Sequence, residues 1–212
     1  MKKPLIIAAL CMSMTAGALT ACGSGQTSAN TAATTQAAET QATETEAAAE
    51  LPAGIAEGPI LLTSDGQSAD VNVVQTLLKK CEIESDLNAT VTADGLDGYK
   101  TLVLAIGGSS KGLGAAGVDE NQELERVKSV IAKAKENGMT VIALHIGGSA
   151  RRGTLSDKFI PDALQNADAA IIVAEGDSDG MMKGIVTDAN VPTAFVENQV
   201  GAMEPLKTLF GK

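Results

Sequence analysis

Short runs of aliphatic and β-branched residues alternate with amphipathic helical patterns along most of this chain. The central runs, 101–106, 140–146 and 169–173, are apolar on both faces, as strands covered by helices on both sides are. Between the runs the period is helical, and residues 69–81 and 120–137 each place their aliphatic side chains on one face. This alternation predicts a mostly parallel sheet between two layers of helices.

The predicted fold is therefore an α/β three-layer sandwich with a mostly parallel sheet of about five or six strands. Right-handed crossovers leave two common strand orders, flavodoxin-like and Rossmann-like, and we favour the flavodoxin-like order with a sixth edge strand. The outer strands are expected at 60–62, 89–91 and 193–196. Pro161 and Pro205 are each expected to interrupt a helical stretch.

The helix predicted over 120–137 carries its own boundary signals. Asp119, with Gln122 three residues later, forms a capping-box pattern, and Asn137-Gly138 is a stop signal. The glycine-rich segment 107–117 before it is interpreted as a long loop, more than a simple connection needs.

The first 22 residues have the pattern of a lipoprotein export signal. Lys2 and Lys3 precede an apolar run from 5 to 21, a length that fits a secretory signal and is short for a membrane span. Leu19-Thr20-Ala21-Cys22 resembles a bacterial lipobox, which implies that Cys22 takes a diacylglycerol thioether and becomes the mature N-terminus. The alternatives are an ordinary secretory signal and an uncleaved anchor. We expect a cell-membrane protein, lipid-anchored and facing the extracytoplasmic side.

Residues 23–57 are mostly Ala, Thr, Gln, Glu, Ser and Gly. Such a segment cannot bury enough apolar surface to offset its chain entropy, so we expect a flexible stalk followed by one domain over 58–212. If Cys11 leaves with the signal and Cys22 is acylated, Cys81 is the lone thiol, and we expect it as a small buried residue.

Composition excludes several classes of function. A net charge of −10 and 2% aromatic residues leave neither the cations nor the stacking rings that nucleic-acid binding uses. Three cysteines and one histidine exclude a Cys/His zinc cluster and a disulfide framework. The G-x-G-x-x-G match at 112–117 lies too far beyond its strand for a dinucleotide loop. We expect no metal and no cofactor.

Gly, Ser and cationic residues concentrate in the loops after the strands, where parallel sheets bind their ligands. We call this edge of the sheet the rim. Gly107-Gly108-Ser109 and Gly147-Gly148-Ser149 are twin elements there; glycine permits close backbone approach, and N–H and hydroxyl groups suit an anion. The alternative is that the glycines serve tight turns and the cations are solvated or pair with Asp157 and Glu175. The candidate ligand-binding residues are Ser64, Gln67, Ser68, Gly107, Gly108, Ser109, Ser110, Lys111, Gly147, Gly148, Ser149, Arg151 and Arg152.

A second hypothesis is a small serine hydrolase. Residues 108–112 match the G-x-S-x-G nucleophile pattern, so Ser110 would be the nucleophile, His145 its base and Asp157 the orienting acid. Against it, a nucleophile elbow needs its helix at once, and the usual hydrolase order places the histidine last. The alternative for His145 is a partly buried strand-end residue bonded to backbone.

Three segments, 59–70, 107–117 and 145–158, resemble a family of uncharacterised bacterial lipoproteins, mostly Gram-positive. The resemblance spans most of 59–197. It implies one α/β domain behind a lipobox and no established activity, so no catalytic residue is carried over.

The prediction is a membrane-tethered lipoprotein that binds a small anionic ligand at the rim and presents it to a membrane transporter or sensor. We lean against an enzyme. The alternatives are the hydrolase and a structural or partner-binding surface protein.

Overall fold

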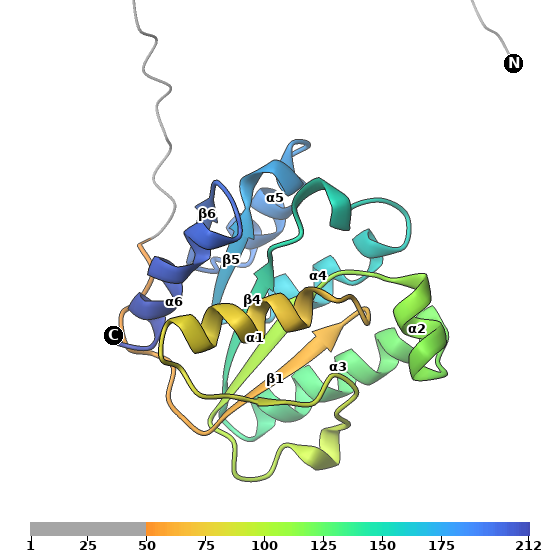
Figure 1. Cartoon of the computed structure of the whole chain (residues 1–212), viewed down its shortest axis with the longest axis horizontal. Coiled ribbons are helices and arrows are strands. Elements are labelled where there is room, and N and C mark those ends of the chain that lie inside the picture. Colours follow the sequence, from red (N-terminus) through yellow and green to blue (C-terminus); the bar gives the residue numbers. More distant parts are fainter. Residues whose placement is uncertain (1–49) are drawn as a thin grey trace, which may run out of the picture. The chain divides into compact units, whose positions relative to one another are not determined.

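The computed structural model describes residues 50–212, so the predictions for the export signal, for Cys22 and for most of the stalk lie outside the described residues. Within them, six parallel strands form one sheet in the order β2-β1-β3-β4-β5-β6 (Figure 1). The strands are β1 (Ile60–Asp65), β2 (Asp86–Leu87), β3 (Thr101–Ile106), β4 (Thr140–His145), β5 (Ala169–Val173) and β6 (Thr193–Val196).

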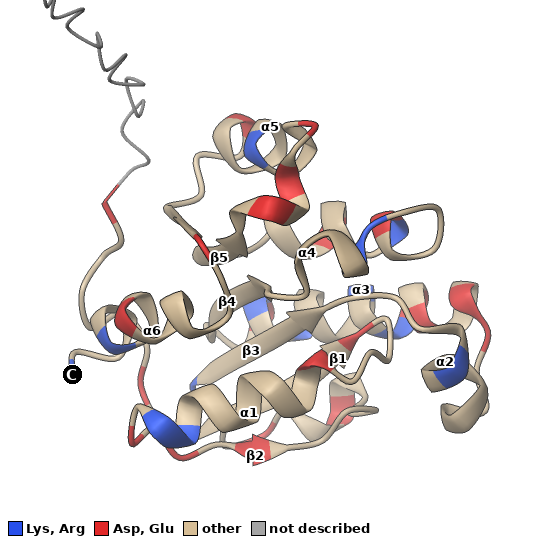
Figure 2. Ribbon diagram, turned by 45° about the horizontal axis from the view of Figure 1, so that its top comes forward, with Lys and Arg blue, Asp and Glu red and all other residues tan. Residues whose placement is uncertain are grey.

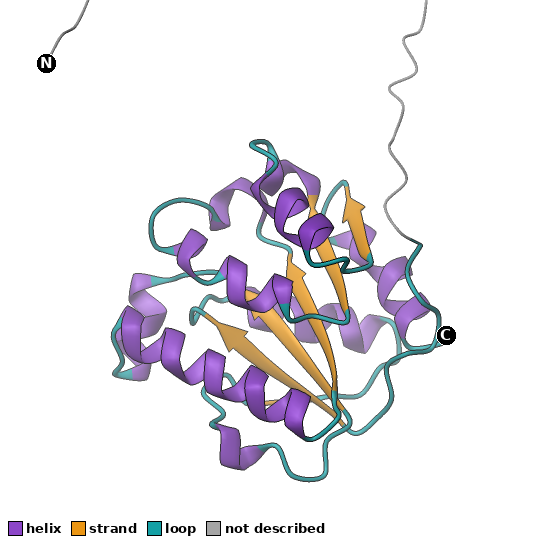
Figure 3. Cartoon of the chain, turned by 180° about the vertical axis from the view of Figure 1, so that it is seen from behind, coloured by secondary structure: helices purple, strands orange, loops and turns teal. Residues whose placement is uncertain are grey.

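Helices cover both faces of this sheet, as Figure 3 shows from behind. The α-helices are α1 (Asp70–Lys80), α2 (Ser110–Ala116), α3 (Glu120–Glu136), α4 (Ile160–Gln165), α5 (Met181–Asp188) and α6 (Met203–Leu209). The short 3-10 helices are η1 (Ala93–Gly95), η2 (Gly148–Arg151), η3 (Ser156–Lys158), η4 (Ala174–Asp177) and η5 (Val200–Ala202). Val74 of α1 and Leu206 of α6 pack on one face of the sheet. Val130 of α3, Ile160 of α4 and Met182 of α5 pack on the other.

This is the flavodoxin-like order with a sixth edge strand, as predicted. The chain leaves β1 toward α1 on one face and leaves β3 toward α3 on the other. The switch point of the sheet therefore lies between the carboxyl ends of β1 and β3, where ligands of such folds bind.

The boundaries of two strands differ from the prediction. β1 continues through Thr63, Ser64 and Asp65, which were expected in a loop, because β3 pairs with the strand as far as Asp65 opposite Ile106. The prediction of a strand at 89–91 is wrong. β2 pairs with β1 only through Asp86 and Leu87, so the edge strand ends before the β-branched residues that suggested it.

The segment 107–117 is not a continuous loop. Ser109 caps α2 by accepting a hydrogen bond from Gly112 N at 3.1 Å, and Gly117 ends the helix in the left-handed region. Pro205 does not interrupt its helix, because it lies in the first turn of α6, where proline removes no intrahelical hydrogen bond. Pro161 lies at the start of α4, after the short η3.

Other local predictions are confirmed. Asp119 and Gln122 form both halves of the capping box of α3, and Gly138 adopts a positive φ directly after Asn137. Cys81 is a free thiol and is 3% exposed, and its burial raises the pKa of the thiol.

The ordered domain begins earlier than the predicted boundary at residue 58. Gly54 and Ala56 donate backbone hydrogen bonds to Thr208 and Leu209 at the end of α6. Ala56 is buried, and Leu51 and Ile55 pack against the same core. These few apolar side chains within a polar segment are enough to attach it, because the end of α6 supplies free carbonyl groups.

We expect residues 50–57 to stabilise the domain. A chain without residues 1–57 should unfold with a free energy about 2–3 kcal/mol below that of a chain without 1–49, because it loses the burial of Ile55 and its neighbours. Urea unfolding followed by circular dichroism measures the difference. Equal midpoints would show that the segment rests on the surface without stabilising the domain.

Candidate functional site

The crevice between β1 and β3 is bridged by the protein's own backbone. Gln67 and Gly108 form an isolated antiparallel bridge, and Ser109 N donates to Gly66 O at 2.9 Å. Gly107 N donates to Asp65 O at 2.8 Å. The loops after these strands are thereby joined, so a ligand at the switch point would lie on top of them and not between them.

The first glycine of each twin element makes room for the protein's own side chains. A Cβ at Gly107 would lie 2.8 Å from Ser68 Oγ and 3.0 Å from Arg151 Cδ. A Cβ at Gly147 would overlap the Arg151 side chain and lie 2.5 Å from Asp70 Oδ2. The close backbone approach predicted for a ligand is thus used by Arg151 and Asp70.

Arg151 forms an ion pair across the rim. Its Nε donates to Asp70 Oδ2 at 2.9 Å, and its Nη1 lies 3.4 Å from Ala150 O. The Arg151 side chain is 27% exposed and that of Asp70 is 8% exposed. No hydrogen bond within residues 50–212 engages Arg151 Nη2 or Asp70 Oδ1, so each partner keeps one free position.

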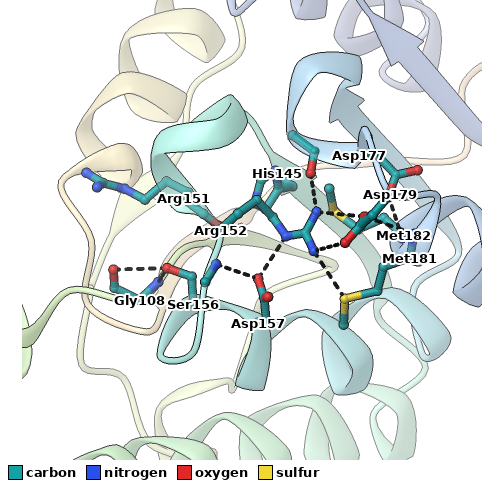
Figure 4. Close-up of polar contacts among 12 residues, drawn as sticks. Gly108, His145, Arg151, Arg152, Ser156, Asp157, Asp177, Asp179, Met181 and Met182 are labelled. Atoms are coloured by element: carbon teal, nitrogen blue, oxygen red, sulfur yellow. Dashed lines mark hydrogen bonds and ion pairs between the residues drawn. The ribbon is translucent and has the colours of Figure 1, made fainter.

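Arg152 connects three segments and points away from Arg151 (Figure 4). Its Nε donates to Asp157 at 2.8 Å, Nη1 donates to Gly176 O, and Nη1 and Nη2 bind both oxygens of Asp179. The hydrogen bond from Arg152 lowers the pKa of Asp179 to about 2. All nitrogens of this guanidinium have protein partners, which is the pairing with Asp157 that the sequence left open as the alternative.

The other candidate residues are spread over the rim with different surroundings. Ser64 is fully buried and its Oγ has no partner. Ser68 is 3% exposed, and its Oγ accepts from Asp70 N. Ser149 donates to Glu175 at 2.8 Å. Ser110 and Lys111 are exposed in the first turn of α2. Gly108 packs against Ser156, and Gly148 packs against Glu175.

The sequence analysis missed a buried charge cluster beside the rim. Glu123 of α3 is 1% exposed and accepts hydrogen bonds from Gly66 N, Gln67 Nε2 and Arg126. Arg126 also donates to Ser64 O and Val91 O. The signal in the sequence is a Glu and an Arg three residues apart on one helix, but that spacing is common on exposed helix faces.

Asp65 ends β1 inside the protein, and neither of its carboxyl oxygens has a hydrogen-bond partner among residues 50–212. Burial raises the pKa of this carboxyl well above its usual range, and the nearby negative charge of Glu123 raises it further. Burial therefore disfavours the charged form of Asp65 in the folded protein.

We expect Asp65→Asn to stabilise the domain most at neutral pH. A raised folded-state pKa gives stability that is complete below the unfolded pKa and is lost as pH rises toward the folded value. The variant should therefore match the native chain near pH 3 and exceed it by about 1–3 kcal/mol at pH 7. Urea unfolding at several pH values tests this, with exposed Asp94→Asn as control. A gain that is the same at both pH values would contradict the assignment.

His145 lies beneath the rim and is fully buried. Its Nε2 lies 2.9 Å from Arg151 O, and its Nδ1 has no hydrogen-bond partner in the part of the chain that the structure describes. Burial lowers the pKa of His145, and the charge of Arg152 acts in the same direction. This is the strand-end residue bonded to backbone that the sequence offered as the alternative to a catalytic base.

Within the described residues, no hydrogen bond or ion pair joins the three candidate hydrolase residues. Because α2 begins at Ser110, the objection that a nucleophile elbow needs its helix at once no longer applies. Within residues 50–212, however, no hydrogen bond links Ser110 to His145. Asp157 is held by Arg152 and Gly153 N and makes no hydrogen bond to His145.

Two surface hollows lie away from the rim. One of about 310 Å³ lies at the amino ends of the strands beside Lys100 and Asn137, and one of about 300 Å³ lies between α3 and α4 beside Lys128 and Asp162. Among residues 50–212 no group of three or more His, Cys, Asp or Glu side chains is placed to hold a metal ion. In the same part of the chain, no helix combines the length and the apolar character needed to cross a membrane.

Fold and rim together define a doubly wound α/β domain whose switch point carries an Arg–Asp pair on glycine backbone. The chain belongs to the family described as a domain of unknown function (DUF6305), whose model matches residues 57–210. The expectation of an uncharacterised family is thereby confirmed. No curated protein matches the chain.

The comparison with solved structures finds matches at low similarity. TesA is 14% identical, with a TM-score of 0.30 and coverage of 63% of this chain and 76% of that chain. The psychrotrophic esterase EstA from Pseudoalteromonas sp. is 13% identical, with a TM-score of 0.30 and coverage of 69% and 90%. A GDSL-like lipase from Bacteroides thetaiotaomicron is 10% identical, with a TM-score of 0.31 and coverage of 72% and 77%. At these TM-scores the matches carry no argument about this chain.

Proposed function

We propose that this protein is a membrane-tethered lipoprotein whose α/β domain recognises a small carboxylate-bearing ligand at the rim and presents it to a membrane transporter or sensor. The observation that supports this best is the position of Arg151. The aliphatic part of its side chain lies against Gly107 and Gly147, where ligands of doubly wound sheets bind, and within residues 50–212 its Nη2 has no hydrogen-bond partner. A guanidinium with free N–H groups is the side chain that best recognises carboxylates.

Lys111 is the second cation of the proposed site. It is exposed in the first turn of α2 and makes no ion pair within residues 50–212. Arg152 has a different place in the proposal. Because all its nitrogens are occupied, it holds the loops after β4 and β5 and does not contact the ligand.

Acidic residues are numerous near the rim, as the red ribbon segments beside β1 and between β5 and α5 in Figure 2 show. The ligand must therefore bind at Arg151 locally and not through a broad positive field. Binding should weaken with salt, because Arg151 is partly exposed and exposed charges are screened.

The test is a thermal-shift screen of the full chain in detergent with carboxylates, phosphates and amino acids. A ligand that raises the melting temperature of the native chain should lose this effect in Arg151→Gln and keep it in Lys79→Gln. The control removes a charge from the far end of α1. If no carboxylate shifts the native chain, or if Arg151→Gln binds as the native chain does, the rim is only a set of glycine turns.

The tether is tested separately. Cys22→Ala should abolish lipid labelling of the chain in cells and move the protein out of the membrane fraction. Unchanged labelling in this variant would contradict the lipobox assignment.

A further inference from the structure

We infer that the ligand at the rim is a zwitterion, with a carboxylate bound by Arg151 and an ammonium group bound by Asp70. This inference rests on the proposed function and names its ligand class as free α-amino acids. It starts from the fact that Arg151 is already paired. Asp70 Oδ2 lies 2.9 Å from Arg151 Nε, and the Asp70 side chain is only 8% exposed.

A simple anion is a poor match for this pair. Any carboxylate that reaches Arg151 also comes close to the negative charge of Asp70. At such distances the repulsion from Asp70 offsets most of the attraction to Arg151. Asp70 is kept in place by the first turn of α1 and by its contact with Arg151 over Gly147, so it cannot simply turn away.

A ligand that carries both charges avoids this repulsion, because its ammonium group contacts Asp70. Within residues 50–212 neither Arg151 Nη2 nor Asp70 Oδ1 has a hydrogen-bond partner, and the first is a donor and the second an acceptor. The ammonium and carboxylate groups of an α-amino acid are attached to one carbon, so they can face two protein charges that are themselves in contact. Each new hydrogen bond is charge-assisted, and the site and ligand stay neutral together.

Ser68 adds a third polar group at the same place. Its Oγ lies beside Gly107 with the Arg151 side chain. Among the described residues its one hydrogen bond is accepted from Asp70 N, so the hydroxyl proton can donate to a ligand. Ser68 is 3% exposed, and a buried hydroxyl without an acceptor is unfavourable. A bound carboxylate would supply that acceptor.

Gly107 and Gly147 explain why the side chains of Arg151, Asp70 and Ser68 can come together. Side chains at positions 107 or 147 would displace Arg151, Asp70 or Ser68. The twin glycines therefore leave room for the Arg151–Asp70 pair. Within residues 50–212 each partner of this pair keeps one atom without a hydrogen bond. A purely structural ion pair needs neither the free positions nor its place at the switch point.

The experiment compares three matched probes on the full chain in detergent by calorimetry: alanine, propionate and ethylamine. Alanine carries both charges, and each of the others carries one. We expect alanine to bind at least about tenfold more tightly than either of the others. Propionate binding as tightly as alanine would overturn the zwitterion and leave the proposed function intact. Failure of all three probes, and of the screened carboxylates, would overturn both.

Variants separate the two charges. Asp70→Asn should weaken alanine by at least about tenfold and strengthen propionate, because it removes the repulsion and the ammonium partner together. Arg151→Gln should weaken both ligands, and Asp94→Asn, an exposed acid on η1, should change neither. If Asp70→Asn leaves the ratio of the two affinities unchanged, the inference is wrong. The comparison of probes on the native chain decides the question even if a variant fails to fold.

Discussion

Replacing Arg126 with alanine should lower the free energy of unfolding by about 3–5 kcal/mol. The substitution leaves Glu123, which is 1% exposed, without its counter-charge. It also removes the donors to Ser64 O and Val91 O, which connect α3 to the end of β1 and to the segment after β2. Breaking a buried pair by removing one partner is among the most damaging single changes.

The control is Lys128→Ala on the same helix. Lys128 pairs with Asp162 at 3.3 Å, but its side chain is 58% exposed, so the loss should stay below about 1 kcal/mol. Urea unfolding followed by circular dichroism suits a chain without tryptophan. Similar losses in the two variants would show that Glu123 is not held by its pairing with Arg126.

Gly112→Ala should be nearly as damaging, with a loss of about 3 kcal/mol. Gly112 lies in α2 against the loop after β1, and a Cβ there would overlap the backbone oxygen of Gln67. Because Gln67 also forms the bridge to Gly108, relief of this clash would require the two rim loops to separate.

Gly114→Ala is the matched control in the same helix. A Cβ at Gly114 meets nothing within 4 Å, so alanine should stabilise the helix by up to about 1 kcal/mol. Thermal unfolding of both variants measures the contrast. A stable Gly112→Ala variant would contradict the closed crevice between β1 and β3.

The sequence predicted the layers and the long helices because these depend on periodic apolar residues. It left two strand orders open, and the structure has the favoured one. Runs such as 101–106 and 169–173 are buried on both sides and match their strands. The prediction failed where strand pairing, and not hydropathy, decides which residues form a strand. Ser64 and Asp65 are polar but lie in β1 because β3 pairs with them, and 89–91 is β-branched but lies beyond the edge pairing.

The rim was located from the sequence, but the partners within it were not. Glycine and cation positions are visible in the sequence, whereas their contacts depend on how loops cross after folding. Arg151 and Arg152 are neighbours in the chain, yet one pairs with Asp70 on α1 and the other with Asp157 and Asp179. Asp70 pairs with Arg151 and Glu123 pairs with Arg126. Both acids lie on helices, and no feature of the neighbouring sequence distinguishes them from acids on an exposed helix face.

The most direct test of the account is a map of backbone amide resonances in the full chain as alanine is added. The account predicts shifts concentrated at Gly107, Gly147 and Arg151 and at the first turn of α1, and the loss of these shifts in Arg151→Gln. Shifts confined to the hollow beside Lys100 and Asn137 would contradict the assignment of the rim as the ligand site, and the absence of any shift would contradict the assignment of an α-amino acid as its ligand.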